Sequence, residues 1–319
     1  MNRRRLTLLG ALALGVALTA TAVTANAQTV PPETNIVGGT PVAEGAFPWM
    51  AHLSMGCGGS LISPDIILTA AHCFGGGSST VTAMIGKVKF TQGEQRSGTQ
   101  FKAGPGPEKA DWAVLKLSKP SSITTFAPIP TDGSLDASPT FRAIGWGATK
   151  EGGRGSDILL QVDVPLVPDA QCGAAATVEI CAGDMAKGGI DTCQGDSGGP
   201  LMANRGGTWV VVGMTSWGEG CARPGQPGHY AKASAMLTDI KAAITALGGQ
   251  QPPAAGGSTP PTSAPLPTGT NTPAPTGAGT PSGRPSTEPA ASPSSSSSSS
   301  SPAEPRPTEP ASTSRAVSW

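Results

Sequence analysis

The sequence is poor in aromatic, charged and histidine residues. Aromatic residues make up 4% and charged residues 13% of its 319 positions, the formal net charge is zero, and there are three histidines. A neutral balance gives no electrostatic reason to expect a nucleic-acid or membrane-surface partner. There is no Cys-x-x-Cys pair and no Cys/His cluster with the spacing of a zinc site, because His72 and Cys73 alone are too close together. We therefore expect no nucleic-acid partner, no metal and no cofactor.

Aliphatic residues are almost absent from the last segment, residues 248–319. It consists mainly of Pro, Ser, Thr, Ala and Gly, includes a run of serines from Ser294 to Ser301, and has one aromatic residue, Trp319. Such a composition cannot bury enough apolar surface to offset the entropy lost on ordering, which predicts a disordered tail. A spacer or glycosylated stalk is one role for it, and a tether to the cell wall is the alternative.

The first segment, residues 1–27, has the pattern of a secretory signal peptide. A basic start at Arg3–Arg5 precedes an apolar stretch, and small residues at Ala25–Ala27 surround a cleavage point. An uncleaved membrane anchor is disfavoured because the stretch is interrupted by threonine and barely long enough to span. We expect a secreted protein, and the basic start leaves the general and twin-arginine export routes open.

The middle segment holds all six cysteines, which in an exported chain predicts disulfides. Short apolar runs separated by Gly, Pro, Ser and Asp predict an all-β barrel or sandwich, and these runs are residues 60–62, 66–69, 81–85, 112–117, 141–144, 158–164 and 209–214. The proline-punctuated stretch 120–139 is predicted to cross between two halves. Helical spacing of apolar residues predicts one terminal helix over 234–247, with Ser234 as its cap and Gly248 as its stop.

A glycine-rich loop, residues 191–200, contains the best candidate nucleophile. It reads Asp-Thr-Cys-Gln-Gly-Asp-Ser-Gly-Gly-Pro, and its glycines permit a turn that aims the amides of Gly195 and Ser197 at one point beside the Ser197 hydroxyl. An activated nucleophile needs a base and oxyanion donors close by. A surface loop with an incidental serine is the alternative reading.

Two further runs offer a base and a carboxylate to orient it. His72 lies in the run Leu-Thr-Ala-Ala-His-Cys, and Asp111 opens the apolar run Asp-Trp-Ala-Val-Leu-Lys-Leu. An aspartate there is costly to bury unless it is paired, which favours pairing with a histidine over a role in a turn. His52 on a strand and His229 in a Gly/Pro loop are expected to be non-catalytic.

Together these motifs resemble the chymotrypsin family of serine proteases, and most closely the trypsin-like enzymes secreted by actinomycetes. The resemblance covers residues 36–247, and the motifs agree in order: Ile36-Val37-Gly38-Gly39, the runs through His72 and Asp111, Gly145-Trp146-Gly147, the loop through Ser197, and Ser216-Trp217-Gly218. It implies two antiparallel Greek-key β-barrels with a C-terminal helix. It also implies a catalytic triad of His72, Asp111 and Ser197, with the amides of Gly195 and Ser197 as the oxyanion hole.

The resemblance also implies specificity and activation. Asp191, six residues before Ser197, is expected at the floor of the primary pocket and favours Arg or Lys, with Gly218 and Gly228 as the walls. Ser216, Trp217 and Gly218 are expected to pair with the substrate backbone. Residues 28–35 would be a propeptide, and after cleavage the new amino terminus at Ile36 would pair with Asp196. Because Asn35 precedes Ile36, a separate activating protease is expected.

The remaining implications concern disulfides, partners and departures from the family pattern. The expected bridges are Cys57–Cys73, Cys172–Cys181 and Cys193–Cys221. Expected partners are protein or peptide substrates and protein inhibitors, and the expected state is a monomer. The span between Cys172 and Cys181 and the stretch between Gly86 and Asp111 are short, no calcium loop is evident, and His229 replaces a usually apolar residue. An inactive homologue acting as a binding protein is the alternative, disfavoured because every triad and pocket residue is present.

Overall fold

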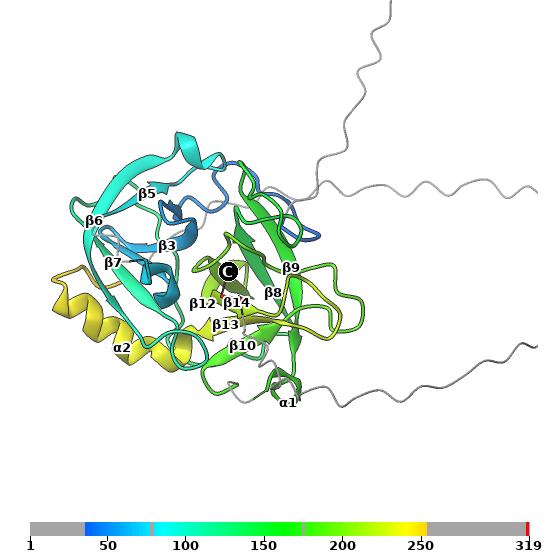
Figure 1. Ribbon diagram of the computed structural model, residues 1–319. Coiled ribbons are helices and arrows are strands. Elements are labelled where there is room, and N and C mark those ends of the chain that lie inside the picture. The colour runs from blue at the N-terminus through cyan, green and yellow to red at the C-terminus, as the bar shows by residue number, and fades with distance from the viewer. Residues whose placement is uncertain (1–35, 77–79, 174–175, 254–316, 319) are drawn as a thin grey trace, which may run out of the picture. The chain divides into compact units, whose positions relative to one another are not determined.

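The computed structural model describes residues 36–76, 80–173 and 176–253, together with the backbone of 317–318. The predicted signal peptide, the predicted propeptide and most of the predicted tail lie outside the described residues. Two closed barrels of antiparallel strands, joined by a crossing segment, make up most of what is described (Figure 1).

The first barrel contains six strands, in the order β2-β3-β4-β7-β6-β5. Their bounds are β2 Met50–Leu53, β3 Cys57–Ser63, β4 Ile66–Thr69, β5 Val81–Ile85, β6 Glu94–Ala103 and β7 Ala113–Leu117. Two short 3₁₀ helices, η1 Ala71–Phe74 and η2 Phe90–Gln92, follow β4 and precede β6. Alternate side chains of β5 are buried, as expected for a strand with one face in the barrel core.

The second barrel is formed by β8-β9-β10-β13-β12-β11, and it closes because β8 and β9 also pair. Its strands are β8 Thr140–Gly145, β9 Leu160–Val167, β10 Glu179–Ala182, β11 Pro200–Arg205, β12 Thr208–Gly218 and β13 Gly228–Lys232. The short strands β1 Thr40–Pro41 and β14 Val317–Ser318 add to β9 and β12, and the short helix α1 Asp169–Cys172 follows β9. The fold is therefore the two-barrel, all-β fold that the motifs implied.

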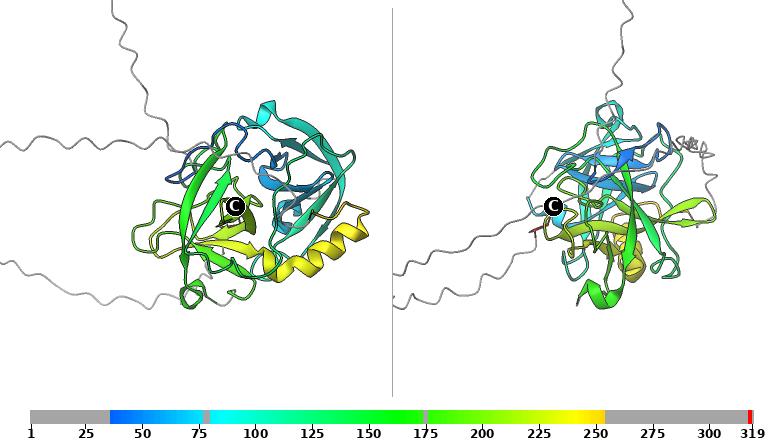
Figure 2. Two further views of the ribbon diagram at one scale, coloured as in Figure 1. Left: turned by 180° about the vertical axis from the view of Figure 1, so that it is seen from behind. Right: turned by 90° about the vertical axis from the view of Figure 1, so that its right-hand side faces the viewer.

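The helix α2, Ala233–Ala246, follows the second barrel directly but packs on the first. Its buried residues Met236, Leu237, Ile240 and Ile244 join the same apolar cluster as the interior of the first barrel, and both views show α2 beside that barrel (Figures 1 and 2). The helix thus holds the two halves together by apolar burial.

Several details differ from the sequence-based expectations. The helix begins one residue earlier than predicted, and Ser234 does not cap it; its hydroxyl instead donates to Asp136 Oδ2 at 2.6 Å. His229 lies in the strand β13 rather than in a loop, because the chain resumes an extended course at Gly228. The stretch 120–139 contains no strand and joins the two barrels, as predicted.

The ordered chain also extends beyond residue 247. The amide of Gln250 donates to Asp65 Oδ1 at 3.0 Å, and the amide of Gly249 donates to Ile244 O at 2.9 Å. In the predicted tail, the backbone of Val317–Ser318 pairs with β12. This pairing differs from a wholly disordered tail, because adding a strand to a sheet edge uses backbone groups and needs no apolar side chains. Residues 254–316 lie outside the described part.

Candidate active site

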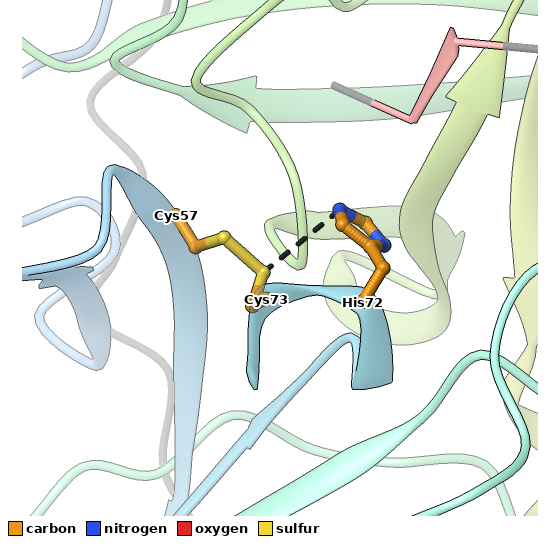
Figure 3. A group of neighbouring side chains, drawn as sticks. All are labelled: Cys57, His72 and Cys73. Atoms are coloured by element: carbon orange, nitrogen blue, oxygen red, sulfur yellow. Dashed lines mark hydrogen bonds between the residues drawn. A yellow bond between two sulfur atoms is a disulfide. The ribbon is translucent and has the colours of Figure 1, made fainter. Parts of the chain in front are cut away.

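His72 is placed by the end of one strand and by a disulfide. The strand β4 ends at Thr69, and His72 lies in the turn of η1 that follows. The bridge from Cys73 to Cys57 ties this turn to β3, and Figure 3 shows the imidazole beside that bridge. The sulfur of Cys73 lies 3.9 Å from His72 Nε2, but both sulfurs are committed to the disulfide and are not free thiolates for a metal.

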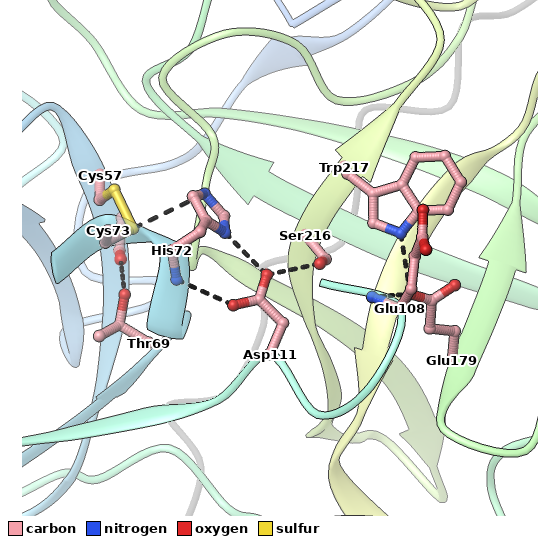
Figure 4. A network of polar contacts seen from close by, with 10 residues as sticks. Cys57, Thr69, His72, Cys73, Glu108, Asp111, Glu179, Ser216 and Trp217 are labelled. Atoms are coloured by element: carbon pink, nitrogen blue, oxygen red, sulfur yellow. Dashed lines mark hydrogen bonds and ion pairs between the residues drawn. A yellow bond between two sulfur atoms is a disulfide. The ribbon is translucent and has the colours of Figure 1, made fainter. Parts of the chain in front are cut away.

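Asp111 is a buried carboxylate held by donors from both barrels. His72 donates through Nδ1 to Oδ2 at 2.7 Å and through its backbone amide to Oδ1 at 3.0 Å. Ser216, on β12 of the second barrel, donates through its hydroxyl to Oδ2 at 2.5 Å (Figure 4). Asp111 is 2% exposed, so these bonds replace the water that its charge has lost. His72 therefore faces Asp111 with its Nδ1 side.

The loop carrying Ser197 is fixed by backbone bonds to both barrels. The amide of Gly58 on β3 donates to Ser197 O at 2.7 Å, and the amide of Gly198 donates to Thr215 O at 2.8 Å. Gly198 has φ +72°, and an added Cβ would lie 2.0 Å from Thr69 Oγ1. Only glycine allows this close approach to the strand that leads to His72.

The Ser197 hydroxyl is buried and has no hydrogen-bond partner in the described part of the chain. The bond from a nucleophilic serine to its base is thus not formed in this structure, and such bonds often tighten only when substrate binds. Because Thr215 precedes Ser216 and Thr69 lies near His72, the loop nevertheless brings Ser197 to the same region as His72 and Asp111.

Three amides of this loop, those of Gln194, Gly195 and Ser197, have no acceptor among the described residues. The N–H groups of Asp196, Gly198 and Gly199 donate to backbone carbonyls. Those of Gly195 and Ser197 donate to no described residue. These two amides are the ones that the resemblance implies as oxyanion donors.

Asp191 lies buried beside Gly228, one of the two residues predicted to form the pocket walls. Its Oδ1 accepts from the hydroxyl of Tyr230 at 2.8 Å and from the amide of Thr192 at 2.7 Å. A Cβ at Gly228 would lie 2.4 Å from the same oxygen, so a side chain there would displace the carboxylate. Burial, with no cation among the described residues, raises the pKa of Asp191 to about 7.

Asp196 is fully buried next to the Ser197 loop. It accepts from the amides of Gly147 at 2.8 Å and Cys193 at 3.0 Å. Burial raises the pKa of its carboxyl to about 7, and the two amide bonds offset this only in part. Ion pairs among the described residues include none to Asp196.

Ile36 is completely buried in the core of the second barrel. The next residue, Val37, forms an antiparallel bridge with Asp191. The segment predicted to become the new amino terminus therefore runs beside the predicted pocket. Ile36 also has φ 55°, a left-handed conformation that is strained for a β-branched residue.

All six cysteines form the three bridges that the resemblance implied: Cys57–Cys73, Cys172–Cys181 and Cys193–Cys221. The last bridge joins the Asp191–Ser197 loop to the segment after Gly218. Cys172 and Cys181 lie close to His229, but their sulfurs are bonded to each other. His52, which the sequence analysis expects to be non-catalytic, stacks on Phe90 with ring centroids 4.0 Å apart, and burial lowers its pKa.

One buried polar network was not predicted. Glu179 accepts from Trp217 Nε1 at 2.8 Å (Figure 4). Its other oxygen lies 2.9 Å from His229 Nδ1, and the His229 ring stacks on the Trp217 ring. Two sequence signals for this network were available: His229 stands in place of an apolar residue, and Glu179 lies within the run Val-Glu-Ile-Cys. Neither signal shows which residues meet, because the three lie on different strands.

Comparison with known proteins identifies the family. The family profile described as trypsin matches residues 36–240. The chain belongs to the trypsin family of serine proteases. It is 42% identical over 252 residues to a trypsin-like protease of Streptomyces glaucescens, covering 75% of this chain and 91% of that protein. It is 37% identical over 235 residues to serine protease 56 of Mus musculus, covering 66% of this chain and 39% of that protein.

As a member of this family the protein is a serine endopeptidase, a hydrolase whose substrates are proteins or peptides. Within the part of the chain that the structure describes, no helix is long and apolar enough to cross a membrane.

The buried carboxyl of Asp196 predicts a pH-dependent stability of the uncleaved chain. Its folded pKa of about 7 lies above the ordinary value of 3.8, so between these values the folded state holds a proton that the unfolded chain releases. The free energy of unfolding should fall as pH rises through this window, by up to about 4 kcal/mol for this group. Urea unfolding between pH 4 and 8 measures it, and Asp196→Asn should flatten the curve.

The control is Asp239→Asn, on the exposed face of α2, which should keep the wild-type slope. The free energy of unfolding of Asp196→Asn should still depend on pH in part, because burial also raises the pKa of Asp191. An unchanged slope in Asp196→Asn would contradict the prediction.

Proposed function

We propose that the chain is a secreted endopeptidase that cleaves after Arg or Lys through an acyl-enzyme, and that it is made as a zymogen activated by cleavage before Ile36. The observation that carries the specificity is Asp191, a buried carboxylate with no cation among the described residues and with glycine at position 228 against it. A bound guanidinium or ammonium group would supply the missing partner.

The proposed mechanism gives each residue a role drawn from the catalytic triad of this family. Ser197 attacks the carbonyl carbon while His72 takes its proton, and His72 then gives that proton to the leaving amine. Asp111 holds the imidazole through Nδ1 and stabilises its charged form, supported by the Ser216 hydroxyl. Water then attacks the acyl-enzyme with His72 again as base, which releases the product acid and restores Ser197.

The amides of Gly195 and Ser197 would stabilise the oxyanion in this mechanism. Their lack of acceptors among the described residues supports this role, since donors already aimed at the substrate need no reorganisation. Ser216, Trp217 and Gly218 would pair with the substrate backbone, with Gly218 and Gly228 leaving room for a long cationic side chain. Secreted protein inhibitors that mimic a substrate strand would bind at the same place, and we expect the enzyme to act as a monomer.

Activation by cleavage at Asn35–Ile36 is supported by two features. Ile36 is strained while its φ is set by the bond to Asn35, and cleavage removes that torsion. Asp196 is buried with only backbone amides as partners among the described residues, and a new amino group would supply a cation. Pairing would lower the pKa of Asp196 and increase stability at neutral pH.

Specificity is tested with the chain that begins at Ile36, assayed on matched chromogenic peptides ending in Arg, Lys, Phe or Ala. Cleavage should be confined to Arg and Lys, since an apolar side chain would face the buried carboxylate. Asp191→Asn should lower kcat/KM for Arg and Lys by about a hundredfold or more, as expected when a desolvated charge pair is lost.

Ser197→Ala is the control and should abolish turnover of every substrate. A folded Ile36 chain that cleaves none of the four peptides would instead favour a binding protein of the same fold.

The identity of the activating enzyme is tested on the uncleaved Ser197→Ala chain. Because Asn35 carries no cationic side chain, a trace of the mature enzyme should leave the Asn35–Ile36 bond intact over many hours. Amino-terminal sequencing or intact mass measures this, and an Asn35→Arg variant is the positive control that the mature enzyme should process. Rapid conversion of the Asn35 chain would show that no separate protease is needed.

A further inference from the structure

Glu179 is a buried carboxylate that the proposed mechanism does not use. It lies on β10, is 2% exposed, and its two oxygens contact three different elements. Oε1 accepts from Trp217 Nε1 at 2.8 Å and from the backbone amide of Glu108 at 3.1 Å, while Oε2 lies 2.9 Å from His229 Nδ1. A buried carboxylate is costly unless its oxygens are hydrogen-bonded. These contacts therefore constrain the positions of Trp217, Glu108 and His229 relative to Glu179.

The contacts hold the Trp217 side chain on two sides. Trp217 and His229 are opposite each other on β12 and β13, and their rings stack at 3.7 Å with an interplanar angle of 14°. The single polar atom of the indole bonds to Glu179. The ring can therefore neither turn about its χ angles nor tilt without breaking a buried contact. Trp217 is only partly buried, so part of the ring remains accessible.

Glu179 also connects this ring to the loop that carries Asp111. The amide of Glu108 belongs to that loop, three residues before Asp111, and Glu108 has φ 62°. The same loop is joined to β12 a second time by the bond from Ser216 to Asp111. Figure 4 shows both connections side by side. Trp217 and Asp111 are thus held relative to each other through Glu179 and through Ser216.

We infer that Glu179, supported by His229, is a positioning residue for substrate binding: it orients the Trp217 indole against the substrate segment that pairs with Ser216–Gly218. This inference rests on the proposed function and adds a determinant of affinity for extended peptides. A substrate that occupies only the Asp191 site does not reach this surface. The effect of Glu179 therefore depends on substrate length.

The test compares Glu179→Gln with the wild-type enzyme on two arginine substrates, a tetrapeptide anilide and a blocked single-residue ester. For the tetrapeptide, kcat/KM should fall about tenfold, mainly through KM, as expected when a hydrogen bond to a charged group is weakened. For the ester the change should be less than about threefold. The control Asp239→Asn removes an exposed carboxylate from α2 and should behave as wild type on both substrates.

A double-mutant cycle shows whether Glu179 acts through the indole. Trp217→Phe lacks the N–H donor, so Glu179→Gln should have little further effect in that background. Equal losses on both substrates, or the same loss with and without the indole N–H, would overturn the inference. A wild-type chain that cleaves neither substrate would overturn the proposed function itself, and this outcome is distinct from those that overturn only the role of Glu179.

A second, independent observation concerns the end of β12. The backbone of Val317–Ser318 pairs antiparallel with it, with Gly218 opposite Val317 and Trp217 opposite Ser318 (Figure 1). These two residues of β12 are also proposed to hold the substrate backbone. The 63 residues 254–316 can span up to about 200 Å when extended, so the connection from residue 253 is long enough.

The geometry points to a segment of the chain itself, around Val317–Ser318, as a competitor for the substrate-binding edge of β12. Strand addition uses backbone bonds and needs little of the side chains. A tethered strand is present at a high effective concentration even when its intrinsic affinity is low. This inference also rests on the proposed function, and it predicts weak inhibition that substrate overcomes.

The test uses the full chain beginning at Ile36 with Val317→Pro and Ser318→Pro together. Proline cannot donate a ladder hydrogen bond, so KM for the tetrapeptide anilide should fall about threefold or more, with kcat unchanged. The matched control combines Ser298→Pro with Ser299→Pro, which should leave KM unchanged. Equal KM values for all three chains would overturn the inference. A KM that depends on enzyme concentration would also overturn the inference, because it would indicate that the added strand comes from a second copy of the chain.

Discussion

The buried carboxylate of Asp111 is the group on which the arrangement of the site depends. It receives hydrogen bonds from His72 of the first barrel and from Ser216 of the second. Removing water from a carboxylate is tolerable only if donors replace it, so the two barrels must meet in the one arrangement that supplies them. The disulfide at Cys73 and the Gly198 contact with Thr69 then set the positions of the imidazole and of Ser197.

The other buried carboxylates fall into two groups. Asp65 and Glu179 have cationic or titratable partners in Lys116 and His229. Asp191 and Asp196 have hydrogen-bond donors but no cation among the described residues, and burial raises the pKa of both to about 7. A charge left without its partner marks a place where a cation can bind. In the proposed function, the cation that pairs with Asp191 is the substrate side chain, and the cation that pairs with Asp196 is the new amino terminus.

Much of the fold and of the candidate active site could be predicted from the sequence because the signals were local. The glycine-rich loop around Ser197, the runs through His72 and Asp111, and most strand positions follow from composition and order along the chain. The predictions failed where a long-range contact decided the outcome. Ser234 looks like a helix cap, but its hydroxyl bonds to Asp136 on the crossing segment. His229 looks like a loop residue, but it pairs in β13 opposite Trp217 and Cys181.

By itself the sequence determined the family, the order of the elements and the chemical identity of the candidate catalytic groups, because these depend on residue types and on spacing over a few residues. Only the tertiary structure decided that Glu179 bonds to Trp217 and to the Asp111 loop, and that Val317–Ser318 pair with β12. Those contacts join residues that are far apart in the chain. Burial and strand register bring them together, and neither has a signature in a short stretch of sequence.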